Sequence, residues 1–289
     1  NTPPLALPDP RPTRVFDDAF RALGDPTSPT SRAVADALRG AEVVLVRGYL
    51  GNWMPGNFTA VRRALMAQGA HAWIARQSSA RTVQENAARL TDRLRRGDKA
   101  RPLWLLGHSK GGMEALLAAA DPEVAGRLRS IITAQTARGP SPVLESMLLG
   151  LHRDTFGGWS ARMSEALQRA GLTLIGARRG GLELTGERIR DAAAFADDLA
   201  ARSPHLHLAS WSVKPTTWLD SFHRRLGEIA PGVAHDGQFY LADLLWPQRP
   251  NVLLAEVDHA QPVVGGHGFD PVRMWRAAVA VVVSDDVPL

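Results

Sequence analysis

The feature of the sequence that most constrains the fold is a serine between a short apolar run and an alanine-rich segment. Residues 102–106 have the length and composition of a buried strand, and residues 113–120 have those of a helix. Between them, residues 107–111 read G-H-S-K-G, a G-x-S-x-G pattern. A serine on such a sharp turn adopts a strained backbone that exposes its hydroxyl, and the flanking glycines let helix and strand pass closely. Ser109 is therefore the candidate nucleophile.

Short apolar runs alternate with longer helical patterns from about residue 42 onward. This order is typical of β-α-β units around a parallel sheet, and the handedness of the crossovers places helices on both faces. The predicted strands are 42–46, 71–76, 103–106, 128–134, 205–211 and 251–257, and the predicted helices are 55–68, 82–95, 113–120, 187–201 and 270–283. We therefore expect an α/β fold with a mainly parallel sheet of about six strands.

Two regions depart from this alternation within what we expect to be a single domain, residues 1–289. Residues 1–40 carry a proline-interrupted helical pattern, which predicts an N-terminal helical extension on the sheet edge. Residues 139–184 form a long insertion after the fourth predicted strand, where folds of this kind carry a cap or lid. We expect that cap within residues 139–204, and an ordinary helical hairpin over the core is the alternative.

Composition excludes several classes of protein. The absence of cysteine rules out disulfides, cysteine nucleophiles and thiolate metal sites. The net charge of +5 comes from scattered arginines, and no run resembles a nucleic-acid-binding arm, so we expect no nucleic-acid partner. No apolar run approaches the roughly 20 residues that span a bilayer, which predicts a soluble protein. A proline-rich start at Asn1 leaves secreted and cytoplasmic locations open, with secretion favoured, and the oligomeric state is open.

A serine nucleophile needs a base and an acid that orients the base, in the chain order Ser, Asp or Glu, His. His259 directly follows the last predicted strand, and we prefer it to His267, which lies in a glycine-rich loop. Asp236, in the turn-forming stretch A-H-D-G, is the preferred acid over Asp220 and Asp243. Asp258 adjoins the histidine too closely to meet its Nδ1, so we interpret it as a loop or surface charge.

The oxyanion of an acyl-transfer intermediate needs two hydrogen-bond donors aimed at it. The backbone N–H of Lys110 follows the nucleophile at a helix N-terminus and predicts one donor. The loop after the first predicted strand predicts the other, because Gly48 allows a turn that directs the Tyr49 N–H inward. A plain glycine turn at this loop is the alternative.

Five segments in this order carry a family resemblance. The chain resembles the bacterial triacylglycerol lipases of the α/β-hydrolase fold over about residues 42–265. The family's His-Gly-Leu oxyanion loop, Gly-His-Ser-Gln-Gly elbow, Thr-Pro-His-Arg-Gly-Ser segment, Tyr-Ser-Trp-Ser strand and Asn-Asp-Gly acid turn are similar to residues 47–49, 107–111, 136–141, 208–212 and 235–237. The resemblance implies an α/β-hydrolase fold, an ester-hydrolase activity and the roles assigned above to Ser109, Asp236 and His259.

The sequence departs from that family at three positions. Arg47 replaces the oxyanion-loop histidine, and Lys110 replaces a neutral residue. We expect the Lys110 side chain to face solvent, and a preference for anionic substrates is the alternative. The family holds its histidine loop with calcium through an aspartate two residues after the histidine, and Gln261 stands there. Asp220 matches the second calcium aspartate, but one carboxylate with a neutral amide is a weak site for a hard cation. We therefore predict no metal and no other cofactor.

The sequence thus predicts a serine esterase or lipase acting on small-molecule, lipid or polyester esters. Trp53, Met54 and Phe58, just past the oxyanion loop, and Leu148, in the apolar cluster 143–151, are the predicted substrate-binding residues, with core packing as the alternative. A polyester depolymerase or a thioesterase with the same three residues remains open, because they specify acyl transfer and not the leaving group. A catalytically silent binding protein on the same fold is the rival of another class.

Overall fold

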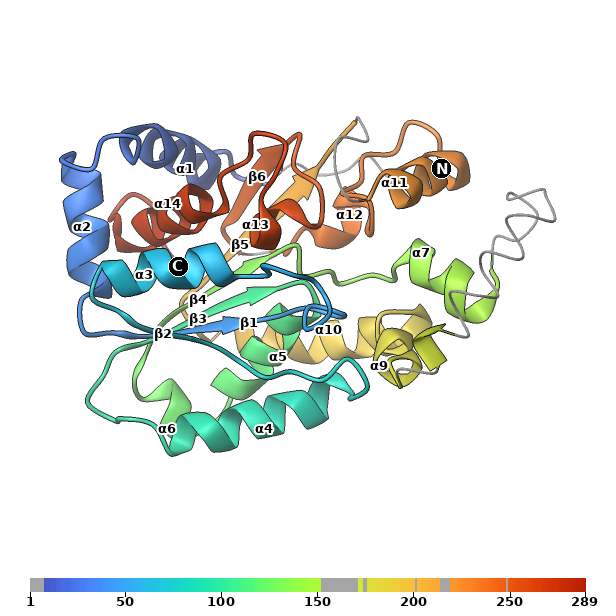
Figure 1. Ribbon diagram of the computed structural model, residues 1–289, viewed down its shortest axis with the longest axis horizontal. Coiled ribbons are helices and arrows are strands. Elements are labelled where there is room, and N and C mark those ends of the chain that lie inside the picture. The colour runs from blue at the N-terminus through green and yellow to red at the C-terminus, as the bar shows by residue number, and fades with distance from the viewer. Residues whose placement is uncertain (1–7, 152–170, 174–175, 201, 214–218, 248) are drawn as a thin grey trace.

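The fold is built on one six-stranded sheet in which all strands are parallel. The structure is a computed structural model that describes residues 8–151, 171–173, 176–200, 202–213, 219–247 and 249–289. The strand order is β2-β1-β3-β4-β5-β6, and the strands are β1 (Glu42–Val46), β2 (His71–Ile74), β3 (Leu103–His108), β4 (Leu128–Ala134), β5 (His205–Trp211) and β6 (Asn251–Ala255) (Figure 1). All six predicted strands are confirmed, to within two residues at their ends.

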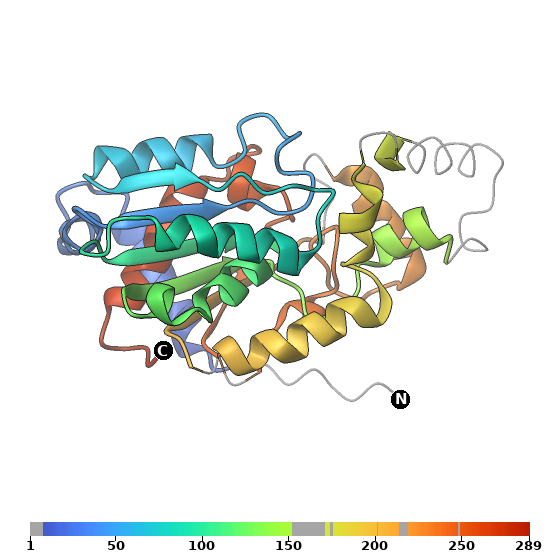
Figure 2. The same ribbon diagram turned by 90° about the horizontal axis from the view of Figure 1, so that it is seen from below.

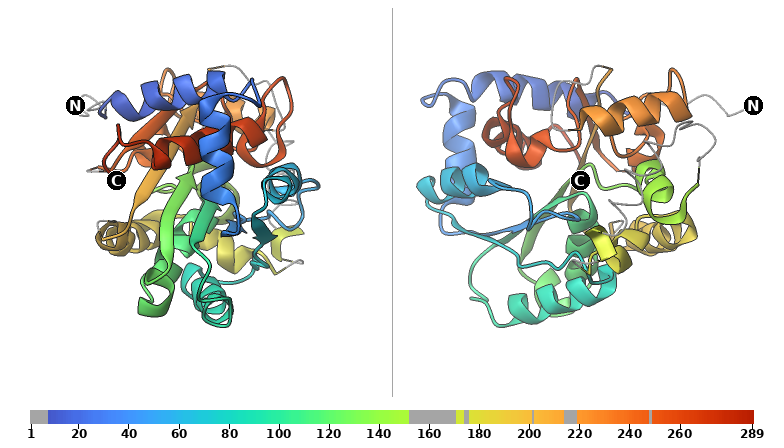
Figure 3. Two further views of the ribbon diagram at one scale, coloured as in Figure 1. Left: turned by 90° about the vertical axis from the view of Figure 1, so that its left-hand side faces the viewer. Right: turned by 45° about the vertical axis from the view of Figure 1, so that its right-hand side comes forward.

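Helices cover both faces of this sheet, as the crossover rule predicts (Figures 2 and 3). Alternate residues of each strand face opposite sides: Val43 and Leu45 pack in one core cluster, and Val44 and Val46 in the other. The first cluster includes residues of α1 (Arg11–Ala22), α2 (Pro29–Leu38), α3 (Thr59–Ala67) and α14 (Pro271–Val283). The second includes residues of α4 (Val83–Arg95), α5 (Lys110–Ala119), α6 (Pro122–Ala125) and α10 (Gly186–Ala200).

Helix α1 lies beside the edge strand β6, and α2 packs against α14. A hydrogen bond joins this strand to α1, because the Leu253 N–H of β6 donates to Thr13 Oγ1 over 3.0 Å. Helix α1 also packs along α14, so residues 11–38 extend the layer on one face of the sheet.

Two helix starts differ from the sequence prediction for local backbone reasons. Helix α5 begins at Lys110 rather than Met113, because the turn is complete at Ser109. Helix α3 begins at Thr59 rather than Pro55, because Gly56 and Phe58 both have positive φ, at 78° and 60°. No helix in the described part of the chain is long and apolar enough to cross a membrane.

Short helices gather at the end of the sheet to which the strands point (Figure 1). They are α7 (Pro142–Leu144), the π-helix η1 (Glu145–Leu149), α9 (Arg178–Leu182), α11 (Asp220–Ile229), α12 (Leu241–Leu244) and α13 (Gln261–Val264). Side chains of α7, η1 and α12 share a third apolar cluster with Ala209 of β5. Residues 152–170 of the predicted cap lie outside the described residues, and a moving lid stays a prediction.

Candidate active site

Ser109 lies at the turn between β3 and α5 with a strained backbone. Its φ of 54° and ψ of −130° fall where a non-glycine residue is rarely found. The surroundings hold this conformation: the Ser109 N–H donates to Ala134 O over 2.9 Å, and the Thr136 hydroxyl donates to Ser109 O over 3.0 Å. A Cβ on Gly111 would lie 2.3 Å from Val46 O, so only glycine lets the helix approach β1 this closely.

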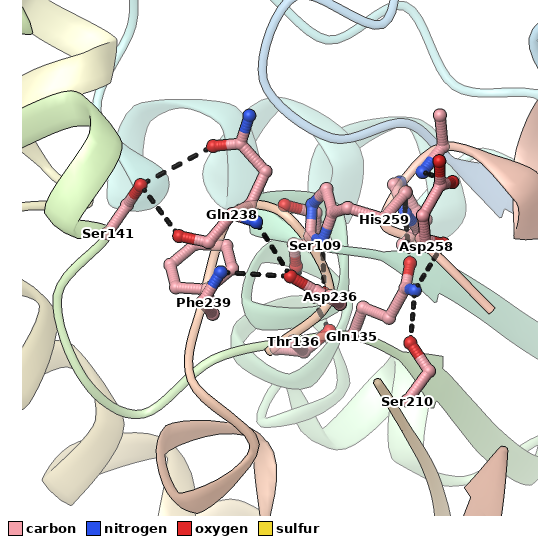
Figure 4. A network of polar contacts seen from close by, with 12 residues as sticks. Ser109, Gln135, Thr136, Ser141, Ser210, Asp236, Gln238, Phe239, Asp258 and His259 are labelled. Atoms are coloured by element: carbon pink, nitrogen blue, oxygen red, sulfur yellow. Dashed lines mark hydrogen bonds and ion pairs between the residues drawn. The ribbon is translucent and has the colours of Figure 1, made fainter. Parts of the chain in front are cut away.

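His259 and Asp236 come together at the carboxyl ends of the strands, beside Ser109 (Figure 4). His259 Nδ1 lies 2.6 Å from Asp236 Oδ2, and the His259 N–H donates to Asp236 O over 2.8 Å. Asp236 Oδ1 accepts from the N–H groups of Gln238 and Phe239, each over 2.9 Å. With Nδ1–H directed at a fully buried carboxylate, His259 presents Nε2 as its free acceptor. Such an imidazole can take a proton from a hydroxyl.

Ser109 and His259 face the same cavity. Ser109 and His259 both line it, and among the described residues no hydrogen bond joins Ser109 Oγ to His259. Such bonds are often long in an unliganded protein and shorten when substrate binds. The arrangement is therefore suited to nucleophilic chemistry once a substrate fills the cavity.

Gln135 and His108 hold the loop that carries His259, the histidine loop, by hydrogen bonds to its backbone. The sequence analysis predicted neither role. His108 Nε2 lies 2.9 Å from Gln135 Oε1 and 2.8 Å from His259 O, so this nitrogen carries the proton and donates. Gln135 Nε2 donates to Asp258 O over 2.7 Å and also to Ser210 Oγ. Burial lowers the pKa of His108 to about 3, which keeps its ring neutral. No local pattern marks Gln135, because its partners are far away along the chain.

Asp258 is a buried residue of this loop, so of its two interpretations, a loop charge or a surface charge, the surface charge is wrong. Only 3% of the residue is exposed, and Oδ1 accepts from the N–H groups of Ala260 and Gln261 over 2.8 and 2.9 Å. The Asp258 N–H donates in return to Gln261 Oε1 over 2.9 Å. Adjacency to His259 excluded Asp258 as the orienting acid, but the same adjacency places it where it can close the loop. Burial raises the pKa of Asp258.

The residues considered for calcium do not form a metal site in the structure. Gln261 uses its amide within the loop, donating to Gly266 O over 3.3 Å, and Asp220 is exposed at the start of α11. Within the described ranges, no three His, Asp or Glu residues are grouped to hold an ion. The independence from calcium stays a prediction. His267, the alternative base, is exposed on its loop.

The loop after β1 lies directly against the nucleophile. A Cβ on Gly48 would lie 2.9 Å from Ser109 Cβ, and the parallel register sets Val46 beside Gly107. The Tyr49 side chain turns toward α9, where its hydroxyl donates to Ala177 O over 3.0 Å. Arg47 braces the same loop by donating to Asn57 O over 3.0 Å. The predicted donors, the N–H groups of Tyr49 and Lys110, thus belong to segments on two sides of Ser109.

The Lys110 side chain is buried, and the expectation that it faces solvent was wrong. Only 3% of the residue is exposed, and its Nζ donates to Arg81 O and lies 3.8 Å from Glu114 Oε1. The side chain leaves the first turn of α5 toward α4 and the loop before it, and away from the cavity. Sequence reasoning could not place it, because its acceptor lies 29 residues away.

The cavity beside Ser109 has a volume of about 140 Å³ and mainly apolar walls. Met54 lines it, together with Leu144, Met147, Leu172, Phe222 and Phe239. A larger groove of about 610 Å³ follows β2 and α4, but it contains none of Ser109, Asp236 and His259. The smaller cavity is therefore the relevant one.

Three predicted substrate-binding residues lie elsewhere. Trp53 is 64% exposed on the loop before α3. Phe58 is fully buried in the core, where its ring lies 5.5 Å from that of Trp275, because the turn before α3 directs it inward. Leu148 packs beneath α9, near Gly181. Core packing, the alternative in the sequence analysis, describes Phe58 and Leu148.

Comparison with known proteins identifies the fold. No protein-family model and no curated protein sequence matches the chain. Among solved structures, it is similar to the metagenomic carboxyl esterase MGS0156, with a TM-score of 0.64 and 19% identity over 84% of this chain and 75% of that one. It is also similar to the mature lipase BlEst2 of Bacillus licheniformis, with a TM-score of 0.59 and 18% identity over 78% and 87%. Together with the parallel sheet and the serine at its turn, these likenesses show that the chain has the α/β-hydrolase fold.

Proposed function

We propose that this protein is a serine hydrolase that cleaves carboxylic esters through an acyl-enzyme on Ser109. The observation that carries the proposal is the 2.6 Å contact between His259 Nδ1 and the buried Asp236, at a cavity that a strained serine also lines. A strained backbone persists only where the surroundings impose it, and such positions cluster at functional sites. The similarity to a carboxyl esterase and a lipase supports the same chemistry.

In the proposed reaction, His259 Nε2 takes the proton of Ser109 Oγ as the oxygen attacks the ester carbonyl. The protonated imidazole is stabilised by Asp236 and then delivers the proton to the leaving alcohol. Water then enters, loses a proton to the same nitrogen and attacks the acyl carbonyl, and His259 returns that proton to Ser109 Oγ as the bond to Ser109 breaks and the acid leaves. Asp236 keeps the imidazole in the tautomer that has a free Nε2.

The N–H groups of Lys110 and Tyr49 are the proposed oxyanion donors. The Lys110 N–H is at the first residue of α5, where helix geometry leaves it without an intrahelical acceptor. Tyr49 belongs to the loop that Gly48 holds against Ser109. Loss of one such donor costs about 3 kcal/mol of transition-state stabilisation in a hydrolase of this kind.

The cavity favours an uncharged acyl group of modest size. Its described lining contains no Asp, Glu, Lys or Arg, and the apolar side chains of Leu144, Met147 and Phe222 form much of the wall. An anionic acyl group would lose its hydration there without gaining a partner. We therefore expect short, neutral acyl esters to be the best substrates.

Labelling with a fluorophosphonate probe tests the proposal. The wild type should be labelled, Ser109→Ala should not, and Ser221→Ala, which changes an exposed serine of α11, should be labelled normally. No labelling of the wild type, or full labelling of Ser109→Ala, would contradict the proposal and favour a silent binding protein. A panel of p-nitrophenyl esters of rising acyl length, one thioester and one aliphatic polyester then identifies the leaving group and the chain length.

A further inference from the structure

A buried ion pair lies directly behind the candidate nucleophile. Lys110 and Glu114 stand one turn apart on α5, with Nζ and Oε1 separated by 3.8 Å, and they are 3% and 1% exposed. Neither side chain lines the cavity of about 140 Å³ that Ser109 and His259 share. The proposed mechanism uses the backbone of Lys110 and no part of Glu114.

Glu114 is held by two buried amides in addition to the lysine. Gln77 Nε2 donates to Oε2 over 2.6 Å, and Asn86 Nδ2 donates to Oε1 over 2.7 Å. Asn86 also exchanges hydrogen bonds with the backbone of Ser78, accepting from its N–H over 3.1 Å and donating to its carbonyl over 3.0 Å. The carboxylate is therefore anchored to residues 77–82, the loop between β2 and α4.

Lys110 is anchored to the same loop. Its Nζ donates to Arg81 O, at the end of the loop where Thr82 caps α4. The first residue of α5 is thus tied, through its own side chain, to residues 77–82. Because Lys110 also carries one proposed oxyanion donor, the tie acts directly on the segment that holds this donor.

The loop 77–82 also holds the segment that carries the other proposed donor. Ser79 Oγ accepts from the N–H of Leu50 over 2.9 Å, and Gln77 O accepts from the Asn52 side chain. Leu50 directly follows Tyr49, so this bond fixes the Tyr49–Leu50 peptide, the one next to the peptide that carries the Tyr49 N–H. A Cβ on Gly180 of α9 would lie only 2.0 Å from Ser79 O, so α9 packs closely against the loop 77–82.

We propose that Lys110 and Glu114 are positioning residues, which fix the two oxyanion donors relative to each other through the loop 77–82. The inference rests on the proposed function, since it assigns a task to side chains behind the same site. The stability of the folded protein does not by itself explain such a pair. Desolvation of two charges often cancels their attraction, and an apolar pair of similar volume gives a protein about as stable. What an apolar pair cannot supply is directed bonds from α5 to Arg81, Gln77 and Asn86.

The proposal predicts a specific kinetic signature. Oxyanion donors act on charge that develops in the transition state, so loosening them lowers kcat and leaves KM nearly unchanged. In Lys110→Met, Glu114→Gln and the double variant, we expect kcat to fall about 10- to 100-fold with KM within about 3-fold of the wild type. Affinity for a trifluoromethyl ketone, which forms a tetrahedral anion on the serine, should fall in parallel.

A surface pair provides the matched control. Lys99 and Glu123 form an exposed ion pair at 2.8 Å, and Lys99→Met should leave kcat unchanged. Ser79→Ala removes only the acceptor of the Leu50 N–H, so it tests the same link without disturbing a buried charge, and we expect about a 10-fold loss of kcat. This variant keeps the proposal testable if the Lys110 and Glu114 variants do not fold.

The outcomes separate this inference from the proposed function. Unchanged kcat in Ser79→Ala and in the folded pair variants, beside an active wild type, would overturn the positioning role alone. A fall in stability with wild-type kcat and ketone affinity would likewise show that the pair serves only folding. An inactive, unlabelled wild type would instead reject the hydrolase itself.

Discussion

The two sides of Ser109 are held by different kinds of interaction. On the histidine side, His108 and Gln135 hold the loop through neutral hydrogen bonds, and Asp258 caps it against Gln261. Figure 4 shows the contacts of Gln135 with Asp258 and Ser210. On the oxyanion side, the buried Lys110–Glu114 pair anchors the neighbouring loop through bonds to an ammonium and a carboxylate. Both networks are long-range, but only the second depends on an ion pair.

This difference predicts different responses to pH and to mutation. Burial lowers the pKa of His108 to about 3, so the His108 ring on the histidine side stays neutral near neutral pH. Burial raises the pKa of Glu114 to about 7, and burial lowers the pKa of Lys110. The oxyanion side therefore changes its charge within the pH range in which such an enzyme would work. The histidine side should respond mainly to loss of hydrogen bonds.

The largest effect is expected from Asp236→Asn. An amide that donates toward Nδ1 favours the wrong tautomer of His259, and in serine hydrolases this change lowers kcat by about 10⁴-fold. We expect a loss of that order for a short p-nitrophenyl ester, with KM nearly unchanged and a folded protein by circular dichroism. Asp243→Asn is the control, since Asp243 lies in α12 and does not contact His259 among the described contacts. A loss below about 10-fold in Asp236→Asn would mean that His259 is oriented by another group.

Gln135→Met should have the next largest effect, because it removes three contacts of the histidine side at once. Asp258 O and Ser210 lose a donor, and His108 loses an acceptor. Leaving buried polar groups unpaired costs about 1–3 kcal/mol each, so we expect a clear loss of unfolding free energy together with reduced kcat. Urea unfolding and steady-state kinetics measure the two effects. An exposed control on α4, Gln84→Met, should change neither, and an unaffected Gln135→Met would show that the histidine loop is held by Asp258 and Gln261 alone.

The sequence predicts the strands and the three candidate catalytic residues better than it predicts the side chains that hold them in place. Strands follow from apolar runs, and Ser109, Asp236 and His259 follow from motif and chain order, which are local or one-dimensional signals. The roles of Lys110, Gln135 and Asp258 depend on partners brought close only by folding: Lys110 Nζ meets Arg81, and Gln135 meets Asp258 across 123 residues. Composition could not show that Trp53 would be exposed and Phe58 buried, since both lie in one apolar loop.

A pH dependence of stability should appear on the oxyanion side. The pKa of Glu114 is raised in the folded protein, so its folded state holds the proton more tightly than the unfolded chain. The contribution of Glu114 to stability is then full below its ordinary pKa of 4.5 and is lost as the pH rises through about 7. Lys110 on the same helix is the charged group that faces it, and Gln77 and Asn86 are its neutral neighbours from the other elements.

Glu114→Gln removes this titration and makes it measurable. Relative to the wild type, the variant should gain unfolding free energy between pH 5 and pH 8, by at most about 3 kcal/mol. Urea unfolding of both proteins at the two pH values gives the difference. Glu123→Gln, at the exposed end of a surface pair, should show little change. A difference that stayed constant with pH would mean that Glu114 keeps one charge state, and the contrast between the two sides would then rest on hydrogen bonds alone.

The smallest effect is expected from removal of calcium. In the lipases that the sequence resembles, calcium holds the histidine loop, whereas here Asp258 accepts from Ala260 and Gln261 and donates back to the Gln261 side chain. These bonds use Gln261, which stands where that family has the calcium-binding aspartate two residues after the histidine, so the loop is closed by its own hydrogen bonds. We therefore expect EDTA to leave kcat and the melting temperature unchanged, and added calcium to raise neither. A clear loss of kcat or of melting temperature on chelation would mean that a bound cation helps to hold the loop that carries His259. Charge would then support both sides of Ser109, and the two sides would no longer differ in kind.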